Sequence, residues 1–525
     1  MIEETPAATP GGDVRAGPPA EADAGGWLPS QVAALAVVAM AGLMVSLTMS
    51  VLIPVLPQVA DDLHSSTTST EWLLTSTLLA AAVGVPIMGR LGDLYGKRLM
   101  LMVCAGFLTV GSLICALSHS LVPLVIGRGV TGLSLAAVSL GISLINVTLP
   151  PRRASSGVAI VSAMLGVGGA LGVPLAGFVG EHADYHLLFW ICVAGGVVSL
   201  LGSWLFLTEP AQRAAGRFDF PGSILLAAAL ICLLLPLSEA ALWGWGAPRT
   251  IGLLAVAAVL IAVFLLTERR VASPLVDLAA NAKPALLLTN AASTCVGFAL
   301  FASFIGTAAY VETPVGSGYG FSASIVVGGL CLLPSGLGML ALSPVSARMT
   351  RRFGPKITLC TGSLVVAAGF VIRIGLTAHL WEIVAGTTIA GAGTGIAYAA
   401  MPALIALAAP HSELAAANGL NSLCRASGGS LASAVGGTIL ASSVVMVGGV
   451  AWPSLTAYRL LFALCAVAAV LGSAIALLVP YPPDYSPSMA ARAVTPEWRS
   501  GPLPATGHGG TPVSPSGAAR PYPGT

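Results

Sequence analysis

Residues 89–98 of this chain read GRLGDLYGKR, and they join two blocks of apolar sequence. Gly92 and Gly96 allow a tight turn in which backbones approach closely, and Asp93 is able to cap the start of a helix. The stretch ends on two basic residues. A short basic turn between two apolar blocks is typical of a cytoplasmic loop that connects two membrane-spanning helices.

The composition of the whole chain is that of a membrane protein. Of its 525 residues, 56% are hydrophobic and 8% are charged, whereas about 25% are charged in an ordinary soluble domain. The net charge of +2 excludes the basic surface that nucleic-acid binding needs. The nine cysteines lie inside apolar blocks, with no CxxC pair and no histidine at metal-ligand spacing, so we expect neither a metal nor a cofactor.

The apolar blocks are long enough to cross the hydrocarbon core as helices, which takes about 20 residues each. They predict an all-α polytopic membrane protein with fourteen transmembrane helices. The first eight spans are expected near 32–53, 72–91, 98–117, 121–147, 157–179, 186–208, 220–238 and 250–267. The last six are expected near 285–310, 322–344, 356–376, 380–408, 415–447 and 458–480.

The basic residues of the loops provide an independent check, because Lys and Arg collect in cytoplasmic loops. With the N-terminus inside, the inner loops contain Arg90, Lys97, Arg98, Arg152, Arg153, Arg213, Arg217, Arg269, Arg270, Lys283, Arg348, Arg351, Arg352 and Lys356. The outer loops and their edges contain only Arg249 and Arg459. This asymmetry predicts an even number of spans and two cytoplasmic termini.

An internal repeat supports the same organisation. The segment that begins GRGVTGLSLAAVSLG at Gly127 resembles the one that begins GTTIAGAGTGIAYAA at Gly386, and in both a polar break and a second glycine-rich block follow. Parallel repeats build two six-helix halves around a site at the bilayer midplane. We therefore predict a disordered cytoplasmic N-terminus (1–31), an N-terminal six-helix bundle (32–208), an inserted two-helix segment (209–284), a C-terminal six-helix bundle (285–480) and a disordered cytoplasmic tail (481–525).

The stretch at residues 89–98 resembles the signature of the major facilitator superfamily of transporters, G-x-L-a-D-r-x-G-r-k/r. A degenerate copy, SPVSARMTRRFG at residues 343–354, follows the corresponding span of the second half. The resemblance implies that these turns lock one face of a carrier closed, and that the gate residues are Gly89, Asp93, Gly96, Lys97, Arg98, Arg348 and Arg352. The alternative is that Asp93 only caps a helix in an inner loop.

Arg128, in GRGVTG at residues 127–132, resembles the family's R-x-x-x-G element. A lone arginine in an apolar block is costly unless it faces a wet cavity or a partner, so we expect it to line the transport cavity. The alternative is an arginine that snorkels to the interface.

The fifth span contains GVGGALGVPLAG at residues 166–177, which resembles the antiporter motif of exporters in this superfamily. Gly172 and Pro174 match the motif, whereas Val173 and Ala176 replace a proline and a glycine. The glycines do not indicate a dinucleotide-binding loop, because no strand precedes them.

The resemblance covers residues 32–480 and is nearest to the 14-helix drug:proton antiporter subfamily. It implies a transporter in the bacterial cell membrane, surrounded by lipid, that exports drugs or a cell-made metabolite in exchange for protons. One departure is Thr48, where drug exporters of this group often have an acidic residue. Two alternatives therefore stay open: an exporter of anionic or neutral metabolites without proton coupling, and a sensor that no longer transports. An enzyme is disfavoured because no catalytic motif occurs in the spans.

The charges within the spans bear on the substrate. None of the 21 acidic residues lies deep in a span, whereas Arg425 comes twelve residues after Glu413, which is about 18 Å along a helix and near the bilayer midplane. A midplane cation without a buried acid favours anionic or neutral polar substrates. The alternatives are that Arg425 only binds backbone carbonyls, and that Glu312 or Asp93 brings a proton-linked acid to the cavity in another conformation.

The loop charges make the topology testable. A reporter domain fused near Gln212 should report a cytoplasmic position, and one fused near His182 an external position. The opposite signal at either site would overturn the predicted topology.

Overall fold

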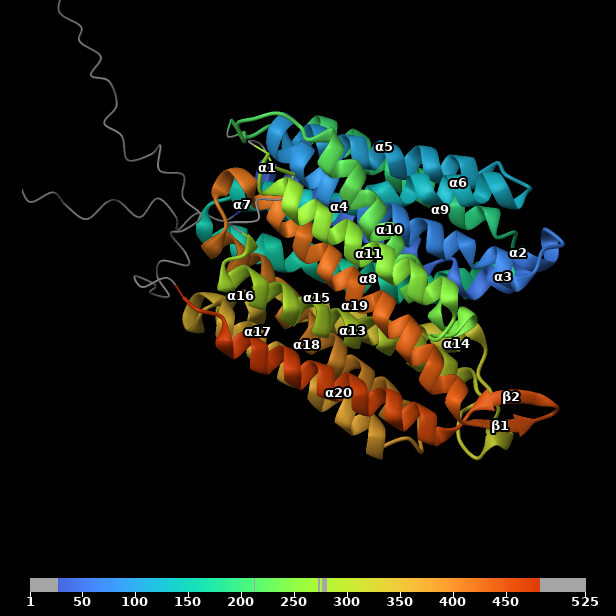
Figure 1. The fold of residues 1–525 in the computed structure, drawn as a ribbon. Coiled ribbons are helices and arrows are strands. Elements are labelled where there is room, and N and C mark those ends of the chain that lie inside the picture. Colours follow the sequence, from blue (N-terminus) through green and yellow to red (C-terminus); the bar gives the residue numbers. More distant parts are fainter. Residues whose placement is uncertain (1–26, 212, 272–273, 276–280, 482–525) are drawn as a thin grey trace, which may run out of the picture.

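The computed structural model describes residues 27–211, 213–271, 274–275 and 281–481, and most of these residues are helical (Figure 1). The predicted disordered termini lie outside the described residues except at their inner edges. The first part contains α1 (Pro29–Ser50), η1 (Ile53–Val55), α2 (Leu56–Asp62), α3 (Thr67–Thr70), α4 (Trp72–Tyr95), α5 (Lys97–Ala116), α6 (Leu121–Gly132), η2 (Leu133–Leu135), α7 (Ala136–Thr148), α8 (Pro151–His182) and α9 (His186–Phe206). Next come α10 (Phe220–Trp243) and α11 (Pro248–Glu268). The last part contains α13 (Pro284–Glu312), η3 (Val315–Ser317), α14 (Ile325–Leu330), α15 (Leu333–Ala341), α16 (Ser343–Phe353), α17 (Pro355–Gly375), α18 (Leu380–Ala408), η4 (His411–Glu413), α19 (Leu414–Ser442), β1 (Val444–Val447), β2 (Val450–Pro453) and α20 (Leu455–Leu478).

Thirteen helical segments of the described chain are long and apolar enough to cross a membrane. Helices suit this environment because their backbone hydrogen bonds are satisfied within the segment. Helix α19 is the fourteenth long helix, and it is less apolar because it carries Asn418, Asn421 and Arg425 among serines and glycines. It packs against α4, α7, α10 and α13, which shield these polar groups from lipid. The predicted fold class is confirmed.

Two predicted boundaries are wrong. The span expected at 415–447 ends at Ser442, because the chain then forms the β1–β2 hairpin, in which Val444 pairs with Pro453. Its turn is Gly448-Gly449, where both residues have positive φ and glycine is favoured. The span expected near 322–344 continues through α16 to Phe353.

The long helices run roughly side by side, so that their ends gather at two ends of the molecule (Figure 1). We call the end that carries residues 89–98 the motif end, and the opposite end, which carries β1 and β2, the hairpin end.

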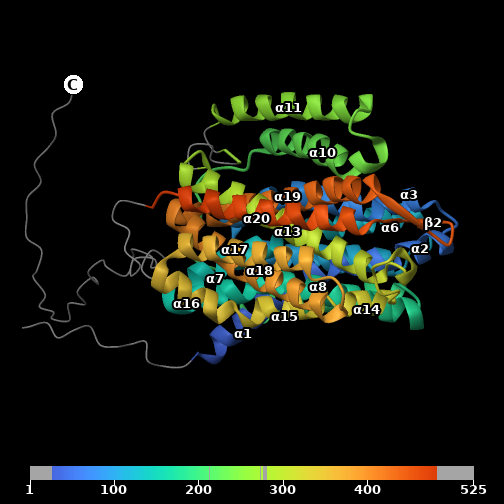
Figure 2. The same cartoon turned by 90° about the horizontal axis from the view of Figure 1, so that it is seen from below.

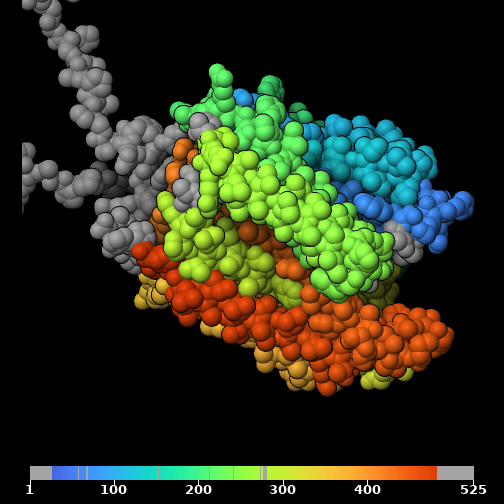
Figure 3. Space-filling model, viewed as in Figure 1, coloured from blue at the N-terminus to red at the C-terminus, as the bar shows by residue number. Residues whose placement is uncertain are grey.

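The helices form two groups with a junction between them. In the first group α1 packs on α8 and α9, and α5 packs on α6 and α9; in the second, α17 packs on α18 and α20, and α13 packs on α19 and α20. The junction is made by α4 and α7 against α19, and by α8 against α14, α15 and α18. The inserted pair lies outside this bundle, with α11 outermost (Figure 2). Helix α10 contacts both α4 and α19, so the pair covers the junction (Figure 3).

Candidate functional site

A buried carboxylate joins the two groups of helices at the motif end. Asp93 lies in the last turn of α4 and is 0% exposed. Its Oδ1 accepts a hydrogen bond from the backbone N–H of Ala415 at 3.2 Å, and its Oδ2 accepts one from Ala416 at 2.8 Å. Both donors lie in the first turn of α19, where the helix dipole favours negative charge. Lys97 forms an ion pair of 2.9 Å with Oδ1. We call Asp93, Lys97 and the first turn of α19 the clamp.

Two glycines of the turn allow the clamp to form. A Cβ on Gly89 would stand 2.9 Å from the carbonyl oxygen of Ala415, so a side chain there would force α4 and α19 apart. Gly96 has φ of +130°, which other residues rarely adopt, and a Cβ there would stand 2.7 Å from the carboxyl carbon of Glu209.

Glu209 and Arg98 cap each other's helices beside the clamp. Glu209 accepts hydrogen bonds from the N–H groups of Arg98 at 3.4 Å and Leu99 at 3.1 Å, in the first turn of α5. In return, Arg98 donates to the carbonyls of Ser203 at 3.3 Å and Trp204 at 2.7 Å, near the end of α9. Sequence reasoning missed Glu209, because a single acid after a span does not distinguish a helix cap from a solvated loop residue.

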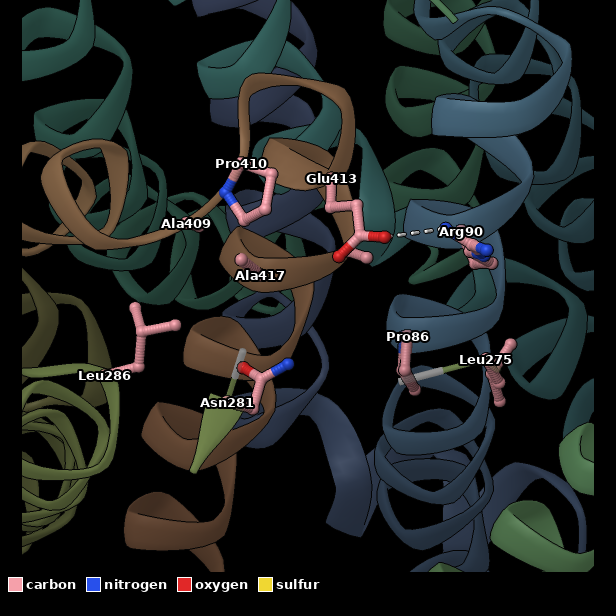
Figure 4. Close-up of a pocket in the computed structure, with 10 residues that line it drawn as sticks. Pro86, Arg90, Leu275, Asn281, Leu286, Ala409, Pro410, Glu413 and Ala417 are labelled. Carbon is pink, nitrogen blue, oxygen red and sulfur yellow. Dashed lines mark ion pairs between the residues drawn. The ribbon is translucent and has the colours of Figure 1, made fainter. Parts of the chain in front are cut away.

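A small pocket adjoins the clamp (Figure 4). Arg90 of α4 and Glu413, which directly precedes α19, point toward each other there and form an ion pair of 3.6 Å. Pro86, Leu286 and Ala417 contribute apolar walls. The free space holds about one water-sized group, so this is a closed contact and not a site for a drug-sized molecule.

The second copy of the turn makes a different contact. When Gly96 is matched to Gly354, Asp93 corresponds to Arg351. Arg351 donates from Nη1 to Ser155 Oγ at 3.1 Å, near the start of α8. At the position of Asp93 this copy therefore has a positive side chain, which does not suit a helix N-terminus as a carboxylate does.

The two predicted gate arginines of the second copy do not reach the junction. Arg348 and Arg352 are exposed, and the guanidinium of Arg352 lies 5.3 Å from the ring centre of Phe353 in the same helix. The structure thus brings together Gly89, Asp93, Gly96, Lys97 and Arg98 but leaves Arg348 and Arg352 apart from them.

Arg128 is buried inside the first group and is 1% exposed. Its Nη1 donates to the carbonyl of Thr48 at 3.0 Å, and its Nε donates to that of Leu73 at 3.3 Å. Its Nη2 has no hydrogen-bond partner within the described residues. The cation therefore ties α6 to α1 and α4, and it lies against Thr48.

Gly172 and Pro174 lie on two faces of α8. A side chain on Gly172 would collide with Ser50 of α1. On the face toward the second group, a Cβ on Gly329 of α14 would stand 2.5 Å from the nitrogen of Pro174. Helix α8 passes through Pro174 without interruption, so both residues serve close helix packing, including packing across the junction.

Arg425 lies in a polar cluster inside the bundle. It donates to Asn421 Oδ1 at 3.2 Å and to Ser422 Oγ at 2.9 Å, and its guanidinium lies 4.8 Å from the ring centre of Tyr398. Asn421 donates to Asn290 Oδ1 of α13 at 3.0 Å. Sequence reasoning did not single out Asn290 or Asn421, although amides within a span are a recognisable signal.

Glu312 is not part of this cluster. It is the last residue of α13, at the hairpin end, and a Cβ on Gly328 would stand 2.9 Å from its Oε1.

Arg373 is a third arginine buried within a span, 0% exposed, and it donates to Ser303 Oγ at 3.0 Å and Thr307 Oγ1 at 2.9 Å. Its guanidinium lies 3.9 Å from the ring centre of Phe462.

Comparisons with known proteins agree with this architecture. A family model described as Major Facilitator Superfamily matches residues 38–338 and 295–513. The chain is 32% identical over 420 residues to the tetracenomycin C resistance and export protein of Streptomyces glaucescens, covering 78% of this chain and 76% of that protein. It is 26% identical over 376 residues to the multidrug resistance protein Stp of Mycobacterium tuberculosis, covering 71% and 69%. The crystal structure of the human organic anion transporter MFSD10 has a TM-score of 0.60 at 17% identity, covering 86% of this chain and 100% of that one, which shows a shared fold.

The clamp predicts how accessible the motif end is to reagents. Asp93→Asn keeps the shape of the side chain but removes its charge, and loss of a charged hydrogen bond costs about 1.5–3 kcal/mol. We expect a cysteine at the buried pocket residue Ala417 to react at least about tenfold faster with a water-soluble maleimide in this variant, because about 1.4 kcal/mol is tenfold.

The measurement requires a background without the nine native cysteines. As a matched control, Asp62→Asn removes an exposed carboxylate at the opposite end and should leave the rate unchanged. Equal rates in Asp93→Asn and the parent chain would contradict the role of the clamp.

Proposed function

Because the chain belongs to the Major Facilitator Superfamily, we propose that it is a secondary active transporter that exports small molecules in exchange for protons through alternating access. The protein is a multi-pass membrane protein, and its family transports small-molecule substrates. The relatives named for tetracenomycin C export and for multidrug resistance support export of a drug or of a metabolite that the cell makes. A probable actinorhodin transporter of Streptomyces coelicolor, 29% identical over 381 residues, supports the same direction of transport.

The observation that carries the proposal is the clamp. It connects α4 of the first group to α19 of the second, so the motif end cannot open unless these hydrogen bonds break. Each bond to a charged group contributes about 1.5–3 kcal/mol, which is enough to bias two conformations without fixing either. In an alternating-access cycle the clamp would hold the motif end shut while the hairpin end opens.

We further propose that the motif end faces the cytoplasm. The basic residues of the chain gather in the loops at this end, and positive residues favour the cytoplasmic side. The described chain enters α1 and leaves α20 at this end, which supports cytoplasmic termini (Figure 1).

A second candidate function is export of anionic or neutral metabolites without proton coupling. It is favoured by Thr48, where a proton-carrying acid would be expected: its hydroxyl donates to the carbonyl of Met44, and its own carbonyl accepts from Arg128. It is also favoured by Arg425, which bonds the neutral side chains of Asn421 and Ser422 and lies against the ring of Tyr398. A sensor of the same fold is the third possibility, and it is disfavoured by the intact clamp.

Proteoliposomes that contain the purified chain test the main proposal, with tetracenomycin C as the first probe. An imposed pH gradient should drive accumulation of the probe, and a probe gradient should change the internal pH. Asp93→Asn and Arg128→Ala should each abolish exchange at normal abundance, because each removes a charge that joins different helices. The matched control Arg217→Ala removes an exposed arginine and should exchange normally. Movement of the probe that does not depend on the pH gradient would favour the exporter without proton coupling. If no tested compound moves across the membrane, the result would favour the sensor.

The charge of Arg425 predicts which substrates the cavity accepts. Like charge is costly in a low-dielectric cavity, so anionic and neutral polar compounds should be exported faster than permanent cations. Arg425→Ala should reduce export of the anions more than that of neutral compounds. Robust efflux of quaternary ammonium dyes that is unaffected by Arg425→Ala would rule out this role.

A further inference from the structure

A chain of hydrogen bonds links Arg425 to helix α13 through one amide side chain. Asn421 and Arg425 lie one turn apart in α19 and are 1% and 6% exposed. The Oδ1 of Asn421 accepts a hydrogen bond of 3.2 Å from Nη1 of Arg425. Its Nδ2 donates to Asn290 Oδ1 at 3.0 Å and to Ser293 Oγ at 2.6 Å, both in α13. Asn421 therefore connects the buried cation to the neighbouring helix.

The orientation of the Asn421 amide follows from Ser293. The single hydroxyl proton of Ser293 is donated to the carbonyl of Thr289 at 2.7 Å, so its oxygen can only accept from Asn421. The amide nitrogen must therefore face Ser293, and the amide oxygen must face Arg425. A hydrogen bond from a guanidinium is stronger than one between neutral groups. Asn421 thus holds one arm of the guanidinium in a defined position.

The positive charge of Arg425 is not balanced by an acid. Among the described residues, no Asp or Glu forms an ion pair with it. A Cβ on Gly297 of α13 would stand 2.4 Å from its carbonyl oxygen, and Glu312 of α13 comes fifteen residues later, or about 22 Å along the helix. In α18, Glu382 precedes Tyr398 by sixteen residues, or about 24 Å. Helix α19 itself contains no acid.

The cation lies close to the junction between the two groups of helices. Its guanidinium is 4.8 Å from the ring centre of Tyr398 in α18. Tyr398 belongs to a buried cluster that also contains Ala163 of α8 and Met339 of α15. Helix α8 is part of the first group, so this cluster spans the junction. Transporters built from two repeats bind their substrate between the repeats, where a charge at the junction can contact it.

The guanidinium keeps most of its capacity to donate hydrogen bonds. It carries five N–H groups, and the side chains of Asn421 and Ser422 accept from two of them. Three donors and a full positive charge are left for a further acceptor. A neutral amide positions the guanidinium without neutralising it, whereas an acid at residue 421 would form an ion pair with it. The choice of an amide at this position therefore keeps the junction positively charged.

We propose that Asn421 determines the charge preference of the transport cavity, because it positions Arg425 and leaves the charge of Arg425 free for an anionic substrate. The substrate class assigned in this way is an organic anion, such as a compound with a carboxylate or an ionised phenol. The inference rests on the proposed export function, since the preference is expressed only when a substrate passes through the cavity. Asn421 acts through Arg425 and is a positioning residue.

Export of two probes of opposite charge from proteoliposomes tests the preference. The parent chain should export carboxyfluorescein, an anion, with a KM at least about tenfold below that for ethidium, a cation; tenfold is the scale of one hydrogen bond to a charged group. Asn421→Asp keeps the size of the side chain but neutralises Arg425, so it should abolish or reverse this preference.

Asn418→Asp is the matched control, because Asn418 is also buried in α19 and lies seven residues, or about 10 Å, before Arg425. It should keep the preference of the parent chain. The parent preference retained in Asn421→Asp would overturn the inference.

Asn421→Ala provides a second variant in case Asn421→Asp does not fold. It removes the acceptor but keeps the charge of Arg425, so the KM for carboxyfluorescein should rise about tenfold while the maximal rate changes little. A purely structural role of Asn421 would instead lower the rates of both probes equally, and that result would overturn the inference.

Infrared difference spectra of the full chain in lipid nanodiscs test the contact between Asn421 and Arg425 without transport. At neutral pH, Asn421→Asp should add no C=O band of a protonated carboxylic acid, because Arg425 stabilises the ionised form. The double variant Asn421→Asp/Arg425→Ala should add this band, because the buried acid then lacks a cation. Equal spectra from the two variants, with or without the band, would overturn the positioning of Arg425 by Asn421.

The two probes also separate this inference from the proposed function. Equal export of both probes by the parent chain, or export of neither, would overturn the anion preference even if tetracenomycin C exchanges for protons. Anion export that does not depend on the pH gradient, together with a preference that Asn421→Asp reverses, would overturn proton exchange and support the inference.

Discussion

The closed motif end depends on one contact, a carboxylate without access to water that caps a helix of the opposite group. Asp93 is buried, so its charge must be balanced by protein groups, and it is balanced by two N–H groups of α19 and by Lys97. This requirement explains the neighbouring sequence. Gly89 lets α4 approach α19, and Gly96 adopts a backbone conformation that returns the chain to α5.

The two copies of the turn differ in a way that follows from charge. Gly96 and Gly354 both have positive φ and both precede a helix, so the backbone of the turn is repeated. At the position of Asp93, however, the second copy has Arg351, which bonds a serine hydroxyl of α8. The α4–α19 contact therefore includes a carboxylate that caps a helix, whereas the contact between α16 and α8 includes a bond from an arginine to a serine hydroxyl.

Much of the fold could be predicted from the sequence, because spans and loop charges are set by the membrane. Helix α19 could be predicted as a span from its apolar run, with support from the repeat, although its polar residues make its hydropathy weak. The β1–β2 hairpin was missed because its residues are as apolar as those of a span. The residues from Gly89 to Arg98 lie together at the motif end, whereas Arg348 and Arg352 lie apart from them, and the gating role of both sets stays a prediction.

The partners of the buried charges could not be predicted, because they come from helices far apart in the sequence. No local pattern indicates that Glu209 caps α5, that Arg128 bonds the carbonyl of Thr48, or that Glu239 meets Thr75. These contacts exist only after the helices have packed. They are also the places where charge is held in an apolar interior, and for that reason they bear most directly on function.

The central claim is that the carboxylate of Asp93 holds α4 and α19 together at the motif end. A pair of spin labels at the exposed positions Tyr95 and Ser412, on either side of the clamp, reports their separation by pulsed electron paramagnetic resonance. The account predicts one narrow, short distance distribution in the otherwise unaltered chain in nanodiscs, and a longer, broader one after Asp93→Asn. The same short distance in both proteins would contradict it.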